Sequence, residues 1–364
     1  MHRTRRGALA AGAACLTGCF GATRQSDQGF LNGGSANVRL GFVGDVMLGR
    51  GVNDRWAGDD PIGVWGSTLE RLRRLDGLVL NLECCISERG DRWPNKSYYF
   101  RADPAFAVRA LDAVDSSVAA LANNHVLDFR EPALRDTRTH LSEAGIAHAG
   151  AGPNIDVALD PAVVVVGGLT VAMFSLTDRF STYAATENNA GTAYVPFEVS
   201  AFPTDRLVRE VLDRVRDHAP DLVVASLHWG PNWETSPDAS QQAFARWLVD
   251  LGVDVVHGHS AHVLQGVEVY RGRPILYDAG DFVDDYVQKE ELQNKRSALF
   301  ELVVTDGQLA GLGIVPIEIE NATATLADGE AAAWVRQTMR ERSERFGTTL
   351  ERADDGLSIS FGTC

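Results

Sequence analysis

The amino-acid sequence predicts one globular domain of mixed α/β structure, preceded by an export leader. Short apolar runs typical of buried strands alternate with longer amphipathic patterns typical of helices. Several of the apolar runs end in His, Asp or Asn beside glycine. Loops that follow the strands of an open α/β sheet gather along one edge, where such folds bind ligands. The two patterns together predict a ligand site at one edge of a sheet.

The expected elements cover the chain from residue 38 to residue 364. Strands are expected at 38–43, 78–80, 116–122, 163–166, 171–176, 222–227, 253–256, 274–277, 299–304 and 309–315. Helices are expected at 64–75, 106–113 and 131–144, in two segments capped by Thr204 and Ser240, and at 330–346. No internal repeat or Pro-rich linker interrupts these residues, so we expect a single domain at 38–364.

The first 37 residues have the pattern of an export signal. Three arginines precede a short apolar segment at 7–16, which is too short to span a bilayer. The segment ends in Leu-Thr-Gly-Cys, which resembles a lipobox with Cys19 as the lipidated residue. We therefore expect a lipoprotein signal peptide at 1–19, a flexible tether at 20–37, and an exported protein lipid-anchored to the outer face of the cytoplasmic membrane. The alternative is a leader with chance cysteines, and paired Arg5-Arg6 also fits twin-arginine export.

The net charge of −15 and the sequence pI of about 5.0 argue against a nucleic-acid partner, because phosphate binding requires a basic field. Lysine occurs only at Lys96, Lys289 and Lys295. Lys96 and Arg101 are expected to be solvated, although a cation on their loop could hold an anionic substrate. The adjacent Cys84 and Cys85 form no recognisable disulfide or zinc pattern and are expected to pack.

Polar residues at five strand ends form the candidate site. They are Asp45; Asn81 with Glu83; Asn124 with His125; His228; and His259 with His262. Carboxylates, an amide and imidazoles together suit one or two ions of Mn²⁺, Fe²⁺ or Zn²⁺ better than Ca²⁺ or Mg²⁺. A carboxylate that bridges two ions can support phosphoester hydrolysis, with His125 as the general acid. A single strand-end histidine is more often structural, and His257 is expected to pack within its strand.

The motifs and their order resemble those of the poly-γ-glutamate capsule biosynthesis protein CapA family, which is related to the calcineurin-like metallophosphoesterases. The matching motifs are GDVMLG at 44–49, NLE at 81–83, ANNH at 122–125, HWG at 228–230, GHSAHVLQGVE at 258–268 and YDAGDFV at 277–283. The resemblance implies a metallophosphoesterase-like sandwich of two packed mixed β-sheets flanked by helices. It also implies metal ligands at Asp45, Glu83, Asn124, His228, His259 and His262, with His125 and Asp45 in catalytic positions.

Three features depart from the related phosphoesterases, and a fourth departs from CapA-like sequences. Met47 stands where their Asp-x-His motif has histidine, Asn81-Leu82-Glu83 replaces Gly-Asp, and His259 and His262 are spaced by two residues. Asp281 stands where many CapA-like sequences have Asn. The acidic pair Asp284-Asp285 is expected at the surface. One firmly held ion, or a site that fills only with substrate, therefore remains an alternative to a complete dinuclear centre.

Three functions fit these features. The first is a surface lipoprotein that takes part in poly-γ-glutamate synthesis, export or anchoring, with the synthesis machinery or an anionic polymer as its partner. The second is a metal-dependent phosphoester hydrolase with an extracellular substrate. The third is a non-catalytic polymer-binding scaffold, because the missing Asp-x-His histidine weakens the expectation of catalysis.

Overall fold

Two β-sheets of different size form the framework of the computed structural model, which describes residues 37–58, 60–199 and 201–361. The predicted signal peptide with Cys19, and the tether up to residue 36, lie outside the described residues. From Ala36 onward the chain is one compact unit.

The larger sheet has the strand order β19-β20-β17-β16-β1-β2-β5-β6, with β15 beside β1 and β18 beside β17. Its strands are β1 (Asn37–Val46), β2 (Gly77–Leu82), β5 (Ser116–Ala120), β6 (Ala147–Ala149), β15 (Asp281–Val283), β16 (Arg296–Thr305), β17 (Gln308–Ile319), β18 (Ala324–Leu326), β19 (Glu351–Ala353) and β20 (Gly356–Ser360). The half from β1 to β6, with β15, is parallel, and β16 to β20 are antiparallel. The sheet is therefore mixed.

The smaller sheet has the order β13-β14-β12-β11-β9-β8. Its strands are β8 (Ala162–Val166), β9 (Leu169–Thr177), β11 (Leu222–His228), β12 (Val255–His259), β13 (Val267–Tyr270) and β14 (Arg273–Leu276). The four central strands are parallel, and the two edge strands are antiparallel to their neighbours. Two short ladders lie outside the sheets: β3 (Cys85–Ile86) with β4 (Arg101–Ala102), and β7 (Ala151–Gly152) with β10 (Gly191–Thr192).

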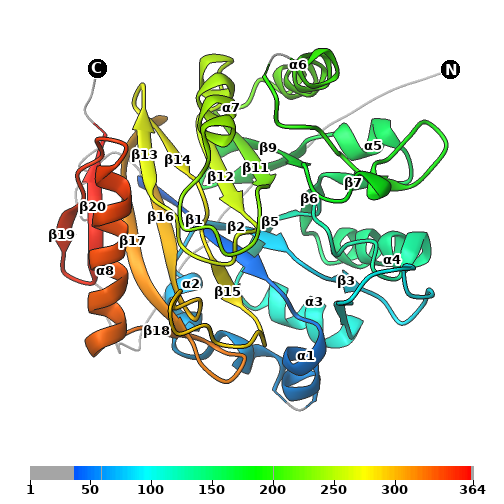
Figure 1. The fold of residues 1–364 in the computed structure, drawn as a ribbon, viewed down its shortest axis with the longest axis horizontal. Coiled ribbons are helices and arrows are strands. Elements are labelled where there is room, and N and C mark those ends of the chain that lie inside the picture. Colours follow the sequence, from blue (N-terminus) through cyan, green and yellow to red (C-terminus); the bar gives the residue numbers. More distant parts are fainter. Residues whose placement is uncertain (1–36, 59, 200, 362–364) are drawn as a thin grey trace, which may run out of the picture. The chain divides into compact units, whose positions relative to one another are not determined.

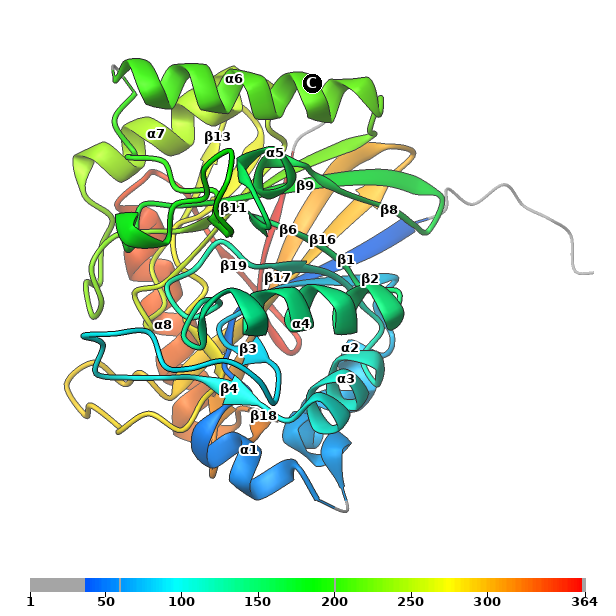
Figure 2. The ribbon, with the colours of Figure 1, turned by 90° about the vertical axis from the view of Figure 1, so that its right-hand side faces the viewer.

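The two sheets pack face to face through one apolar core. Phe42 and Val79 of the larger sheet share this core with Met173 and Val224 of the smaller sheet. Alternate residues of the same strands, such as Val43, point to the other face. Figures 1 and 2 show the sheets side by side, with helices on their outer sides. The expected sandwich of two mixed sheets flanked by helices is confirmed.

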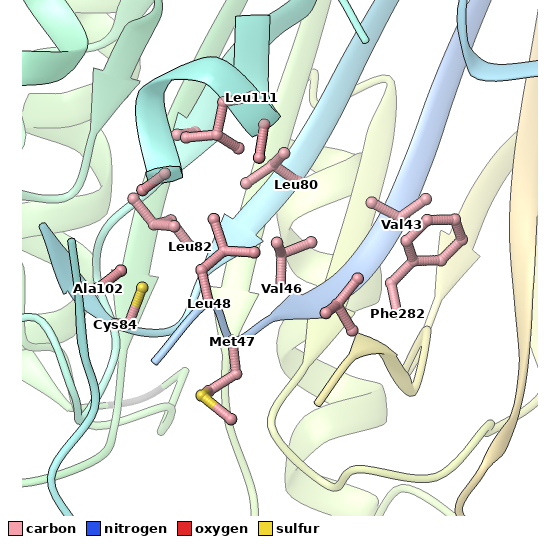
Figure 3. Close-up of a cluster of buried hydrophobic side chains, with 14 of the residues drawn as sticks. Val43, Val46, Met47, Leu48, Leu80, Leu82, Cys84, Ala102, Leu111 and Phe282 are labelled. Carbon is pink, nitrogen blue, oxygen red and sulfur yellow. The ribbon is translucent and has the colours of Figure 1, made fainter. Parts of the chain in front are cut away.

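The helices pack on the outer faces of the two sheets through two further apolar clusters. The larger sheet is covered by α1 (Arg50–Trp56), the 3₁₀ helix η1 (Pro61–Thr68), α2 (Leu69–Leu72), α3 (Pro104–Asp112) and α4 (Arg130–Glu143). The smaller sheet is covered by α5 (Ile155–Leu159), α6 (Phe202–Asp217) and α7 (Ala239–Asp250), while α8 (Gly329–Glu344) packs on β13, β16 and β17. A further 3₁₀ turn, η2, covers Ser181–Tyr183. Figure 3 shows part of the first cluster, where Leu111 of α3 lies near Leu80.

Three expected helix features were wrong in detail. The residues of the helix expected at 64–75 fall into η1 and α2, and η1 is itself kinked at Gly66, which has a non-helical φ of 42°. Ala201, not Thr204, is the N-cap of α6, whose first turn contains proline; the Thr204 hydroxyl donates to the Pro196 carbonyl. Asp238, not Ser240, caps α7, because its carboxylate accepts from the Gln241 amide in a capping box.

Candidate metal centre

The ends of parallel strands from both sheets meet at the candidate centre. Strand pairing places Asp45 of β1 opposite Asn81 of β2 and opposite Asp281 of β15. It also places His228 of β11 opposite His259 of β12. Gly44 allows β15 to run this close to β1, because a Cβ at position 44 would lie 1.8 Å from the Gly280 carbonyl oxygen.

Two groups of donor atoms share Asp45. One group contains Asp45, His228 and His259, and the other contains Asp45, Glu83, His262 and Asp281; in each, the donor atoms lie within 4.8 Å of one another. Asp45 Oδ1 is 3.5 Å from His259 Nδ1, and Asp45 Oδ2 is 3.2 Å from His262 Nδ1. The two carboxylate oxygens of Asp45 therefore face different groups, as a bridging ligand requires.

Three buried carboxylate oxygens in these groups have no hydrogen-bond partner: Asp45 Oδ2, Glu83 Oε1 and Asp281 Oδ2. His262 Nδ1 lies near Asp45 Oδ2, but its proton is shared with Asp281 Oδ1 at the shorter distance of 2.8 Å. A buried charged oxygen without a partner is costly, and a cation satisfies it. The mixed oxygen and nitrogen donors fit a divalent ion of the Mn²⁺, Fe²⁺ or Zn²⁺ type.

Burial sets unusual protonation states in the metal-free centre. Burial, and next the Asp45 charge, raise the pKa of Glu83 well above its ordinary value. Burial also raises the pKa of Asp281 to about 7, although His262 opposes the shift. Burial lowers the pKa of His228 and of His259 well below the ordinary imidazole value. Neutral imidazoles are ready to act as ligands, and a cation that binds the acids displaces their protons.

Hydrogen bonds from neighbouring side chains orient the donors. Asn81 Nδ2 donates to Asp45 Oδ1 at 2.7 Å, and Asn123 Nδ2 donates to Asn81 Oδ1 at 3.1 Å. The Ser226 hydroxyl lies 2.9 Å from His259 Nε2. Asn124 Oδ1 is 2.9 Å from His228 Nε2, so the structure brings the predicted amide ligand to the same place. Such supporting contacts fix the direction of a ligand before an ion arrives.

His257 is structural, as expected. It is fully buried, and its Nε2 lies 2.9 Å from the Val43 carbonyl oxygen of β1. Its Nδ1 lies 3.2 Å from the Ser226 hydroxyl. Both ring nitrogens are therefore engaged away from the donor groups.

Asp128 holds His125 in position. His125 Nδ1 is 2.7 Å from Asp128 Oδ2, and the Phe100 ring stacks on the imidazole at 3.7 Å. His125 Nε2 points the other way and lies 3.9 Å from Glu83 Oε1. Burial, partly offset by Asp128, lowers the pKa of His125 to about 4. A histidine with one nitrogen anchored and the other beside the donor groups has the geometry of a proton donor to a leaving group.

Lys96 does not have the expected role. The Lys96 side chain is 5% exposed, and its ammonium group forms an ion pair with Asp128 and donates to the Asn124 carbonyl oxygen. Lys96 therefore stabilises the loop that contains His125, through its contacts with Asn124 and Asp128. The Arg101 guanidinium lies over the Phe129 ring at 4.0 Å. The expectation that Lys96 is solvated was wrong because its loop folds inward onto Asp128.

A family model described as "Bacterial capsule synthesis protein PGA_cap" matches residues 39–286, which is more than half of the chain. The chain belongs to this family. It is 34% identical to a probable polyglutamine synthesis accessory protein of Mycobacterium tuberculosis, over 86% of this chain and 93% of the relative. It is 29% identical to the capsule biosynthesis protein CapA of Bacillus anthracis, over 88% and 77%, and 28% identical to the PGA biosynthesis protein CapA of Bacillus subtilis, over 78% and 72%.

Met47 contributes no donor atom to the centre. It is fully buried in the outer apolar cluster of the larger sheet, where Figure 3 shows it with Val46 and Leu48. Its sulfur accepts a hydrogen bond from the Gly49 amide. The histidine of the Asp-x-His pattern is therefore replaced by a packing residue, and the second donor group is completed by Asp281 instead.

Two acidic residues, Asp281 and Asp284, have surroundings that differ from those expected from the sequence. Asp281 was expected only to differ from the family pattern, yet it belongs to the second donor group. Its position after Gly280, directly following a buried apolar run, was the available signal. Asp284 was expected at the surface but is fully buried and paired with Lys295. Asp285 is partly buried and paired with Arg50. The adjacent Cys84 and Cys85 are buried and free, as expected.

A cavity of about 300 Å³ lies beside the centre, because His125 and His262 are among its lining residues. Phe100, Trp233 and Tyr286 also line it. Trp229, which follows His228 in the sequence, is buried against Tyr277. The Tyr286 hydroxyl donates to Glu83 Oε2 at 3.0 Å, which ties the cavity wall to the second donor group. In the described part of the chain, every helix is too short or too polar to cross a bilayer.

Proposed function

We propose that this protein is a metal-dependent hydrolase that acts in poly-γ-glutamate capsule synthesis, export or anchoring. One observation carries the catalytic part: Asp45 is shared by two buried donor groups that contain three unpartnered carboxylate oxygens. The capsule part is supported by family membership and by the names of the relatives. A phosphoester is the substrate class that suits this set of donors.

Each residue has a distinct task in the proposed reaction. Asp45 holds the two donor groups together, with His228, His259 and Asn124 on one side and Glu83, His262 and Asp281 on the other. Divalent cations held there would supply positive charge that polarises a phosphoryl oxygen and lowers the pKa of water. His125, once protonated on both ring nitrogens, would give its Nε2 proton to the departing oxygen, while Asp128 accepts from Nδ1 and keeps the ring fixed.

The proposed location is the outer face of the cytoplasmic membrane. The signal peptide at 1–19 and the lipobox cysteine, Cys19, support export and a lipid anchor, and 20–37 would let the domain reach a polymer. The proposed partners are the poly-γ-glutamate synthesis machinery and the acidic polymer itself.

The enzymatic proposal is tested with purified protein, Mn²⁺ or Zn²⁺, and chromogenic phosphodiesters and phosphomonoesters. We expect metal-dependent turnover that His125→Asn removes while metal content stays constant. Unchanged turnover in His125→Asn would reject the mechanism. The biological part is tested by deleting the gene; polymer unchanged in amount and location would reject the capsule role.

A non-catalytic, polymer-binding scaffold is the second candidate, and the position of Met47 favours it. Because Met47 lies in the apolar cluster, it adds no donor atom to either group around Asp45, and the imidazole of the Asp-x-His pattern is missing. Elemental analysis separates the candidates: one tightly held ion without hydrolysis supports the scaffold, whereas two ions with hydrolysis support the enzyme.

A further inference from the structure

Two cationic side chains, Arg50 and Lys289, line the cavity, and only Arg50 has a carboxylate partner within the described part of the chain. Arg50 forms two contacts with Asp285, Nε to Oδ2 at 3.2 Å and Nη2 to Oδ1 at 3.1 Å. Lys289 also lines the cavity, but no carboxylate of the described residues lies within ion-pairing distance of its ammonium group. Lys96 and Lys295 are paired with Asp128 and Asp284. Lys289 is therefore the lysine whose charge is available to a ligand.

The surroundings of Lys289 hold it at the cavity. Its ammonium group lies 5.0 Å from the centre of the Trp233 ring, and that ring is 5.2 Å from the His262 ring. The Lys289 amide donates to Asn294 Oδ1 at 2.6 Å, and Asn294 is itself buried. The Lys289 ammonium group therefore lies at most about 10 Å from the centre of the His262 ring. One substrate can contact both.

A lysine without a described carboxylate partner is notable in a chain with three lysines and a net charge of −15. The overall negative field repels anionic ligands, so an anion can bind only where a local cation outweighs that field. The cavity walls offer aromatic faces, which suit an aliphatic or amide chain between charged groups. The arrangement fits a substrate that has an oxyanion next to its reacting bond.

We propose that Lys289 determines the specificity of the cavity by binding an oxyanion of the substrate, either a carboxylate of an acidic polymer or a phosphate, beside the group that reacts at the centre. Trp233 and Asn294 position the ammonium group, and Arg50, already paired with Asp285, shapes the opposite wall. This inference deepens the proposed function and relies on it only for the choice of a polyglutamate probe.

Binding to the full-length, Mn²⁺-loaded protein tests the proposal. The probes are a short γ-linked glutamate oligomer, the matching neutral oligomer whose α-carboxylates are converted to carboxamides (γ-linked isoglutamine), and inorganic phosphate. We compare wild type with Lys289→Gln, which removes the charge, and Lys289→Arg, which retains it. Arg206→Gln is the charge-matched control, because Arg206 is exposed on α6. Elemental analysis of each variant verifies that the centre is intact.

We expect Lys289→Gln to weaken binding of an anionic probe about three- to fivefold, the size of one partly exposed ion pair. Lys289→Arg and Arg206→Gln are expected to stay within about twofold of wild type, and the neutral oligomer is expected to be insensitive. High salt should remove the difference between wild type and Lys289→Gln. A selective loss for the glutamate oligomer identifies a carboxylate, and a selective loss for phosphate identifies a phosphate group.

Three results would overturn the inference: no anionic probe binds the wild type, both anions bind Lys289→Gln as tightly as wild type, or Arg206→Gln weakens them equally. Turnover of phosphodiesters by wild type is measured separately. Turnover without Lys289-dependent binding rejects the inference alone, whereas Lys289-dependent binding without turnover rejects hydrolysis alone.

Discussion

Metal loading is expected to stabilise the folded protein, and Glu83→Gln is expected to remove the part of that stabilisation that the second donor group contributes, without weakening the metal-free protein. Glu83 Oε1 is one of the unpartnered oxygens, and a cation that binds it binds only the folded state. In the metal-free protein, burial raises the pKa of Glu83 well above its ordinary value, so the side chain is neutral. Glutamine has the same shape and charge, and it keeps an acceptor for the Tyr286 hydroxyl.

The expected magnitude follows from the size of the folded unit. A ligand at about 100 times its Kd adds about 2.7 kcal/mol to the free energy of unfolding. An unfolding entropy of about 2.1 cal/mol/K per residue, over the roughly 330 residues from Ala36 to Cys364, is about 0.7 kcal/mol/K. One saturated site should therefore raise Tm by about 4 °C. Metal-free Glu83→Gln should remain within about 0.5 kcal/mol of wild type.

Thermal melts of chelator-treated protein, with and without Mn²⁺ or Zn²⁺, measure these quantities. Glu143→Gln, at an exposed position of α4, is the matched control and should keep the full metal-dependent rise. The reasoning is refuted if added metal leaves the wild-type Tm unchanged, or if Glu83→Gln retains the full rise.

Three further outcomes are expected. His125→Asn should lower turnover by about 10²- to 10⁴-fold at saturating metal, and a kcat within twofold of wild type would contradict a general acid. His257→Leu should lower the free energy of unfolding in urea by about 1–3 kcal/mol, because the Val43 carbonyl and Ser226 lose a buried partner; equal stability would contradict a structural role. The pKa of Asp281 is raised to about 7, so metal-free wild type loses stability as pH rises from about 4 through 7 relative to Asp281→Asn; melts that show no widening difference would contradict this.

The convergence of the donor residues was predictable from the sequence. Parallel strands end at one edge, so an acidic or imidazole residue at the end of each of several apolar runs is brought to one place. Asp45, His228 and His259 follow this rule, and the structure brings them together. Glu83, Asn124 and His262 were also among the strand-end residues, and the motif order then marked them as ligands.

Other parts of the centre depend on pairing that the sequence does not encode locally. Asp281 reaches the second donor group because the short strand β15 pairs with β1, more than two hundred residues earlier in the chain. A three-residue strand has too little periodicity to be recognised. Asp284 and Lys96 were expected in solvent because isolated charges usually are, and only the folded loops reveal the oppositely charged partners that allow their burial.

The contact between His257 and the Val43 carbonyl has a consequence for engineering. Each of these residues stands two positions before a donor, His259 on one strand and Asp45 on the other. Packed apolar surfaces can shift relative to one another at little cost in free energy, whereas a directional hydrogen bond fixes the relative position of the two strands that it joins. Variants designed to change metal selectivity by substituting Asp45 or His259 should therefore keep His257, because its contact with Val43 fixes the distance between the two strand ends that carry these donors.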